Sequence, residues 1–87
     1  MNNKDLFDRI QTEQKNVNFN DFIKLVEAFG FVKMKKKGKG SHSHQFSHKV
    51  YKMAYLNLQP AGKEAKPIQV RQFKKLVAKY NLTMEDE

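Results

Sequence analysis

The sequence contains no cysteine, no long apolar run and few acidic residues away from its two ends. The absence of cysteine excludes disulfide bonds and thiolate metal ligands. No apolar run approaches the roughly 20 residues that a transmembrane helix needs, and the polar first residues are unlike a signal peptide. We therefore expect a soluble cytoplasmic protein that makes no contact with a membrane.

Positive charge is concentrated in the middle of the chain. Only one of the nine acidic residues, Glu64, lies between Ala28 and Met84, whereas that stretch contains thirteen lysine or arginine residues. An uneven field of this kind attracts phosphate backbones and releases their counterions on binding. A solvated, lysine-rich surface is the ordinary alternative, but the imbalance favours contact with nucleic acid.

The length of 87 residues and the apolar pattern predict one small domain with a modest core. We expect an ancillary helix in residues 1–16, the main domain in residues 17–82 and an acidic tail in residues 83–87. A weak apolar stripe indicates the ancillary helix, and it consists of Leu6, Phe7 and Ile10.

Two stronger patterns predict the main helices. The first covers residues 18–29, where Asn18 or Asn20 can cap the start and Gly30 can supply the left-handed stop. The second begins near Pro67, which suits a first helical position, and ends at Asn81. The expected buried stripes are Phe22, Ile23, Val26 and Phe29 in the first helix, and Val70, Phe73, Val77 and Tyr80 in the second.

Between these helices the apolar period changes to two, which is typical of strands. We expect strands at residues 31–36, 42–48 and 53–59, with a glycine-containing turn at residues 37–41 and a break after the third strand. Alternation would place His42, His44, Phe46 and His48 on one face of the second strand. In the third strand, Ala54, Leu56 and Leu58 would all face one way.

The predicted fold class is therefore α+β. The order is helix, three-stranded antiparallel sheet, helix, preceded by the short N-terminal helix. Both main helices should lie on one face of the sheet, because neither can bury its apolar stripe otherwise. This α-β-β-β-α order is that of double-stranded-RNA-binding domains, although a fold alone does not fix a function.

The most informative stretch runs from Lys33 to His48, where five lysines and two glycines precede three alternating histidines. RNA cleavage without a metal needs a base that takes the proton of the 2′-hydroxyl, and it gains from cations around the developing charge. Imidazole transfers protons near neutral pH. The sequence therefore predicts His42 and His44 as catalytic residues of a site that binds RNA and cuts it.

The predicted RNA contacts are cations and small residues that let a phosphate approach. Glycine leaves the backbone bare, and two cations four residues apart share one face of the last helix. The predicted contacts are Lys35, Lys36, Lys37, Lys39, Gly40, Ser41, Arg71 and Lys75. Tyr51 and Tyr55 are further candidates, for stacking on bases.

Three other interpretations of the histidines stay open. A strand histidine can simply bond a backbone carbonyl, which we favour for His48 near the end of its strand. His42 and His44 form a His-x-His pattern that can bind a metal. Because no carboxylate or thiolate nearby completes a ligand set, we expect neither a metal nor another cofactor. The histidines can also contact phosphate in a protein that binds RNA without cleaving it.

From about Lys15 to the C-terminus, the chain resembles the HicA-type toxins of bacterial toxin–antitoxin systems. The resemblance rests on an ordered set of motifs: Phe29-Gly30-Phe31, Gly40-Ser41-His42-Ser43-His44-Gln45-Phe46, Leu56-Asn57-Leu58-Gln59, the segment from Glu64 to Phe73, and Lys79-Tyr80-Asn81-Leu82.

The resemblance implies a small basic endoribonuclease that cleaves mRNA, inhibits translation and is neutralised by a HicB-type antitoxin. In this family a histidine after the Gly-Ser pair is catalytic, which matches His42. The usual pattern is Gly-Ser-His-His, one residue and an aromatic, whereas here Ser43 separates the histidines and Phe46 falls one position late. Counting back from Phe46 matches His44 instead, so both histidines remain candidates for the base.

Overall fold

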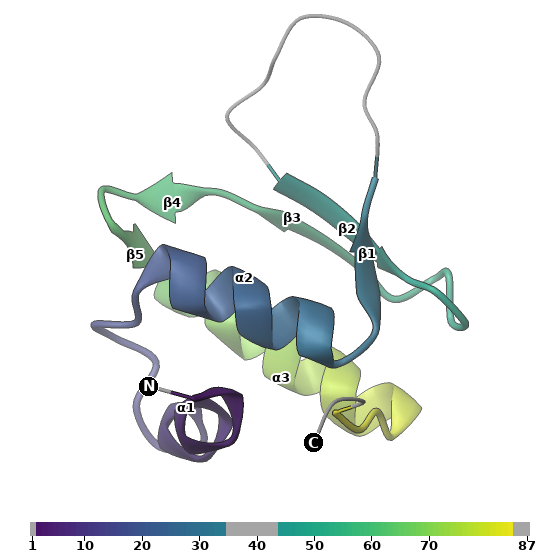
Figure 1. Ribbon diagram of the computed structural model, residues 1–87, viewed down its shortest axis with the longest axis horizontal. Coiled ribbons are helices and arrows are strands. Elements are labelled where there is room, and N and C mark those ends of the chain that lie inside the picture. The colour runs from purple at the N-terminus through teal and green to yellow at the C-terminus, as the bar shows by residue number, and fades with distance from the viewer. Residues whose placement is uncertain (1, 35–43, 85–87) are drawn as a thin grey trace, which may run out of the picture.

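The computed structural model describes residues 2–34 and 44–84 of the chain (Figure 1). The described elements, in chain order, are α1 (Asn3–Ile10), α2 (Phe19–Ala28), β1 (Phe31–Lys33), β2 (His44–His48), β3 (Tyr55–Leu58), β4 (Pro60–Ala61), β5 (Glu64–Ala65) and α3 (Pro67–Tyr80). They form a small α+β domain, and the order of its main helices and of β1, β2 and β3 is the one that the sequence predicts.

The central sheet has the strand order β1-β2-β3, and both pairs are antiparallel. In β2, His44, Phe46 and His48 share one face, and Phe46 is fully buried. Phe46 pairs with Leu56, and His44 pairs with Leu58. Ala54, Leu56 and Leu58 are buried as the alternation predicts. The histidine-bearing face of β2 is therefore the face that meets the core.

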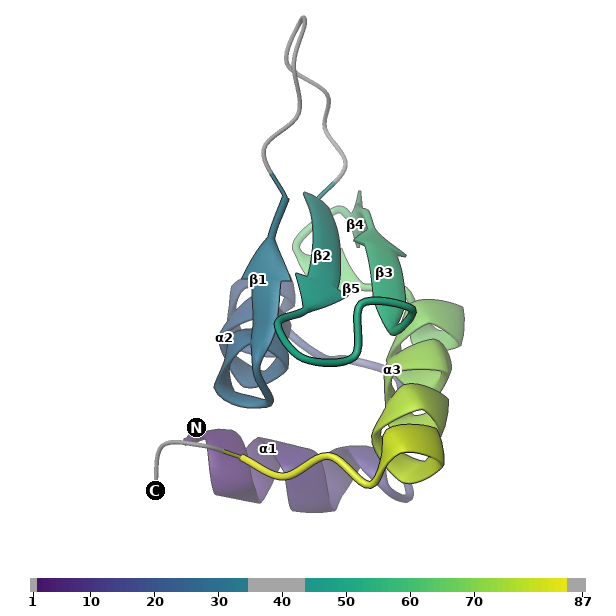
Figure 2. The ribbon, with the colours of Figure 1, turned by 90° about the vertical axis from the view of Figure 1, so that its right-hand side faces the viewer.

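Helices α2 and α3 both lie on that face of the sheet, and α1 crosses beneath them (Figure 2). Helix α2 begins where the Asn18 side chain accepts a hydrogen bond from the backbone N–H of Asp21, at 3.0 Å. It ends before Gly30, whose positive φ of 94° turns the chain directly into β1. Asn81 ends α3 in the left-handed conformation. The predicted ends of both helices are confirmed.

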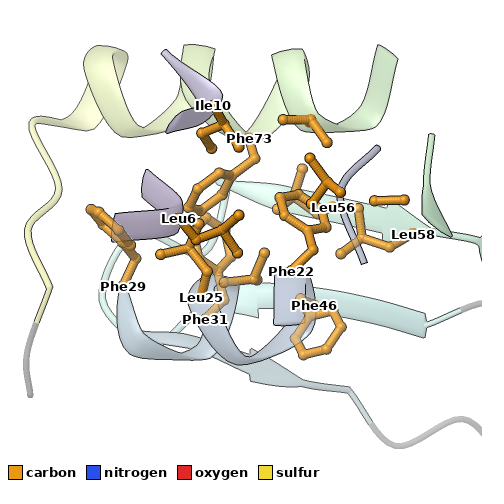
Figure 3. Close-up of a cluster of buried hydrophobic side chains, with 14 of the residues drawn as sticks. Leu6, Ile10, Phe22, Leu25, Phe29, Phe31, Phe46, Leu56, Leu58 and Phe73 are labelled. Atoms are coloured by element: carbon orange, nitrogen blue, oxygen red, sulfur yellow. The ribbon is translucent and has the colours of Figure 1, made fainter. Parts of the chain in front are cut away.

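The core lies between the sheet and the three helices, and aromatic rings fill much of it (Figure 3). Phe73 of α3 makes edge-on contacts with Phe22 of α2 and with Phe29, the residue after that helix, with ring centroids 5.5 and 5.3 Å apart. Leu6 and Ile10 of α1 are almost fully buried in the same core. Helix α1 thus completes the core of the domain, a larger role than the ancillary one we expected.

The third strand ends at Leu58, so the break predicted at Pro60 is confirmed, but the hairpin of β4 and β5 that follows it was not predicted. This hairpin turns through Gly62 at a φ of 67°. The first strand ends at Lys33, whereas we expected it to extend to residue 36. The predicted turn at residues 37–41 and the start of the second strand at residues 42–43 lie outside the described residues.

The hairpin of β4 and β5 is tied to the start of α2. The backbone N–H of Phe19 donates to the carbonyl of Lys63, and that of Ala65 donates to the carbonyl of Val17, each at 2.8 Å. These bonds bring Lys63 next to the first turn of α2. In the part of the chain that the structure describes, no helix has the length and apolar composition to cross a membrane.

Candidate functional site

His44 stands at the first residue of β2, beside the start of α2. Its ring lies 5.2 Å from the ring of Phe19, the first residue of that helix, at an angle of 54°. The side chain is partly buried, unlike the enclosed Phe46 two residues later. The alternation of the strand aims His44 toward the helix layer, and its position at the strand end leaves it accessible to solvent.

A pocket of about 410 Å³ opens at His44. Its walls come from the start of α2 and from the hairpin of β4 and β5, including Asn18, Phe19, Asn20 and Lys63. The pocket therefore combines an imidazole, amide side chains and a lysine around an opening large enough for part of a nucleotide. These groups can hold an anion and exchange a proton.

The charge state of His44 suits a proton acceptor. Partial burial lowers the pKa of its imidazole below the usual value of 6.5, and the positive charge of Lys33 lowers it further. Both causes disfavour the imidazolium form. At neutral pH the ring is therefore predominantly neutral and able to accept a proton.

His48 has a different environment, although it shares the face and strand of His44. It is only 6% exposed, and its Nε2 lies 3.0 Å from the carbonyl oxygen of Phe29. Its Nδ1 accepts hydrogen bonds from the backbone N–H groups of Val50 and Tyr51. Both ring nitrogens are thus used within the fold, so the structural interpretation of His48 is confirmed.

The predicted cations of α3 lie on another surface. Arg71 and Lys75 are both exposed, and with Gln14 and Lys74 they line a hollow of about 240 Å³. That hollow and the His44 pocket share no lining residue. The structure therefore places Arg71 and Lys75 together, as the i, i+4 spacing predicts, but away from His44.

The remaining predicted site residues are outside the described residues. They are His42, Lys35, Lys36, Lys37, Lys39, Gly40 and Ser41. Tyr51 is described, and its ring stacks on that of Tyr80 at 5.2 Å, so this candidate for base stacking already has an aromatic partner within the protein.

The sequence did not identify three residues near His44. Lys63 reaches the pocket through the hairpin, and Phe19 through the first turn of α2. Lys33 belongs to the predicted basic stretch, and from the neighbouring strand β1 its positive charge lowers the pKa of His44. The Gly62-Lys63 turn could have been recognised as a hairpin, but its proximity to His44 depends on tertiary contacts.

Within residues 2–34 and 44–84, no three histidine, cysteine or acidic side chains lie close enough together to hold a metal ion. Comparison with known proteins adds no relative: no family model, curated protein or solved structure matches this chain.

Proposed function

We propose that this protein is a toxin ribonuclease of the HicA type, which cleaves mRNA without a metal. The observation that carries the proposal is the His44 pocket, where a partly buried, neutral imidazole stands beside Lys63 and the first turn of α2. Support also comes from the basic stretch that precedes His44 in the sequence. The α-β-β-β-α order supports a fold like that of double-stranded-RNA-binding domains.

In the proposed reaction, a neutral imidazole takes the proton of a ribose 2′-hydroxyl. The 2′-oxygen attacks the adjacent phosphorus, the bond from phosphorus to the 5′-oxygen breaks, and a protonated group or water supplies a proton to that oxygen. Cations such as Lys33 and Lys63 stabilise the additional negative charge on the phosphate. The expected products are a 2′,3′-cyclic phosphate and a free 5′-hydroxyl.

His42 and His44 are both proposed as the base, because the family pattern favours His42 and the pocket favours His44. The cations upstream of His44 would hold the RNA, and Arg71 and Lys75 would contact a more distant part of the same strand. We further propose that a HicB-type antitoxin neutralises the toxin by covering the His44 pocket.

The test is cleavage of a generic single-stranded RNA in the presence of chelator. A positioned general base contributes about 10²- to 10⁴-fold, so replacing it by alanine should reduce the rate by that factor. His42→Ala and His44→Ala, made singly and together, would identify the base. Gln45→Ala is the matched control, because Gln45 is the next residue of β2 and faces the opposite side of the sheet.

The pH profile supplies a second readout. Because the pKa of His44 is lowered, activity that depends on its neutral form should be full at pH 7 and should fall with a midpoint below 6.5. Replacing the RNA by DNA of the same sequence should abolish cleavage, since DNA lacks the attacking 2′-hydroxyl. Undiminished cleavage by the double histidine variant would refute the proposed mechanism.

The alternative is a module that binds RNA on the same fold without cleaving it. The altered spacing of the histidines favours this alternative, because Ser43 stands where the family pattern has a histidine. It predicts salt-sensitive binding of RNA with no cleavage at any pH. A gel assay that measures both bound and cleaved RNA separates the two functions.

A further inference from the structure

The outer edge of β3 presents backbone groups that the sheet does not use. The backbone N–H of His48 donates to the carbonyl of Ala54, so His48 and Ala54 form a hydrogen-bonded pair of the β2–β3 ladder. Such pairs alternate along an antiparallel ladder. The N–H and C=O groups of Tyr55 and Asn57 therefore point away from β2, and none of the described backbone hydrogen bonds outside the ladder involves them.

Helix α3 runs along this edge. The next outward N–H in the chain, that of Gln59, donates to the side-chain Oε1 of Gln69 at 2.9 Å. Between β3 and the helix lies a groove of about 560 Å³, whose walls include Tyr55, Asn57, Ile68, Gln72 and Leu76. The unpaired backbone groups of β3 thus border a groove with a partly apolar wall.

The groove exposes apolar side chains that do not belong to the core. Ile68 is 60% exposed and Tyr55 is 45% exposed. Proteins usually protect a free sheet edge with lysine or proline, and β1 carries the exposed Lys33 on its own free edge. Strand β3 has the sequence Tyr-Leu-Asn-Leu, with neither a charge nor a proline. The β3 edge is therefore open to an added strand.

We propose that the groove binds an extended, acidic segment of a partner protein, which pairs with β3 as an additional strand. Main-chain hydrogen bonds to an edge strand provide affinity, and a flanking groove selects alternate side chains. Here Tyr55 and Asn57 supply the main-chain groups, and Ile68 and Leu76 supply the apolar wall. This inference does not depend on the proposed ribonuclease function.

The positive charge around the groove favours an acidic segment as its ligand. None of the described residues that line the groove is acidic, one of them is Lys75, and the field around the groove is positive because Glu64 is the sole acid between β3 and the end of the described chain. An acidic segment complements this field, whereas a second copy of the chain would bring another net charge of +8 to the same edge. The apolar wall also suits alternate aliphatic side chains better than a phosphate backbone.

The probe is a blocked heptapeptide in which glutamate and valine alternate, beginning and ending with glutamate. Leu56 and Leu58 face the core, so the side chains of Tyr55 and Asn57 point away from the helices. Residues opposite one another in a ladder share a face of the sheet, so the peptide residues that bond Tyr55 and Asn57 also point away from the helices. The glutamates would occupy those positions, where the net charge of +8 of the whole chain attracts them, and the valines would face α3 and Lys75. Methylating the glutamate amides should abolish binding, whereas methylating the valine amides should leave it largely intact.

A variant of the protein tests the same hydrogen bonds from the other side. Asn57→Pro removes one outward N–H while leaving the ladder with β2 intact, and it should weaken peptide binding about fivefold, as expected for one hydrogen bond. Lys33→Pro is the matched control, because it removes an outward N–H from the β1 edge and should not change peptide affinity.

Binding is measured by ¹H–¹⁵N NMR titration of the full chain. We expect the largest shift changes at the amides of Tyr55 and Asn57, and weaker binding when lysine replaces the glutamates of the peptide. No binding, or equal binding by the two methylated peptides, would overturn the proposal. So would a dimer that Asn57→Pro dissociates, or a single-stranded RNA that occupies the groove and excludes the peptide.

Discussion

His48 offers a direct test of how one side chain holds the C-terminal end of β2 to the core. Its imidazole bridges the carbonyl of Phe29, which ends α2, and the backbone N–H groups of Val50 and Tyr51 in the following loop. We consider His48→Phe, which keeps an aromatic ring of similar size. The edge-on contact with Phe31, at 5.4 Å, can therefore persist while all three hydrogen bonds are lost.

The expected cost follows from the burial of the three partners. The carbonyl of Phe29 belongs to a residue that is 3% exposed, and a buried polar group left without a partner costs about 1–3 kcal/mol. Val50 and Tyr51 are 65% and 45% exposed, so water can replace the imidazole at their N–H groups, at about 0.5 kcal/mol each. The free energy of unfolding should fall by about 2–4 kcal/mol.

The assay is urea unfolding followed by far-UV circular dichroism at pH 7.5, with an unchanged dependence on urea as evidence of two-state behaviour. The matched control is His44→Phe, the same replacement on the same strand and face, which should change the stability by less than about 0.5 kcal/mol. Amide hydrogen exchange at Val50 and Tyr51 should accelerate in the His48 variant alone. Equal stability losses in the two variants, or unchanged exchange, would refute the argument.

Two further predictions concern stability. Because folding lowers the pKa of His44, the imidazole of the unfolded chain becomes protonated at a higher pH than that of the folded chain. The free energy of unfolding should therefore be greatest above pH 6.5, decline as the pH falls below 6.5, and level off below the pKa of the folded state. Paired urea titrations of the wild type and His44→Gln isolate this dependence, and identical profiles would contradict it. Ile10→Ala should cost about 2–5 kcal/mol in the same unfolding assay, since Ile10 is fully buried, whereas a loss below about 0.5 kcal/mol would make α1 peripheral to the core.

Local signals in the sequence were sufficient for the helix ends. Asn18 caps α2 through a hydrogen bond within its own first turn, and Gly30 and Asn81 have the positive φ that their residue types favour. The alternation of β2 likewise predicted that His44 and His48 share the face of Phe46. Each of these features depends on residues only a few positions apart, and a single sequence records them directly.

Features that depend on distant contacts were not predictable in the same way. The strands of the hairpin of β4 and β5 have two residues each, and bonds to Val17 and Phe19 hold it in place. Those partners lie more than forty positions earlier in the chain. The position of Lys63 beside His44 follows from the same bonds. The sequence therefore predicted the strand and the face on which His44 lies, but not the walls of the pocket beside it.

The different environments of His44 and His48 follow from the direction of α2 beneath β2. The helix ends at Phe29, where its last carbonyls need donors, and His48 supplies one through Nε2. The helix begins at Phe19, and His44 lies against that residue, where partial burial and the charge of Lys33 lower the pKa of its imidazole. A histidine at the C-terminal end of the helix thus serves the fold, whereas one at the N-terminal end is kept neutral and open to solvent.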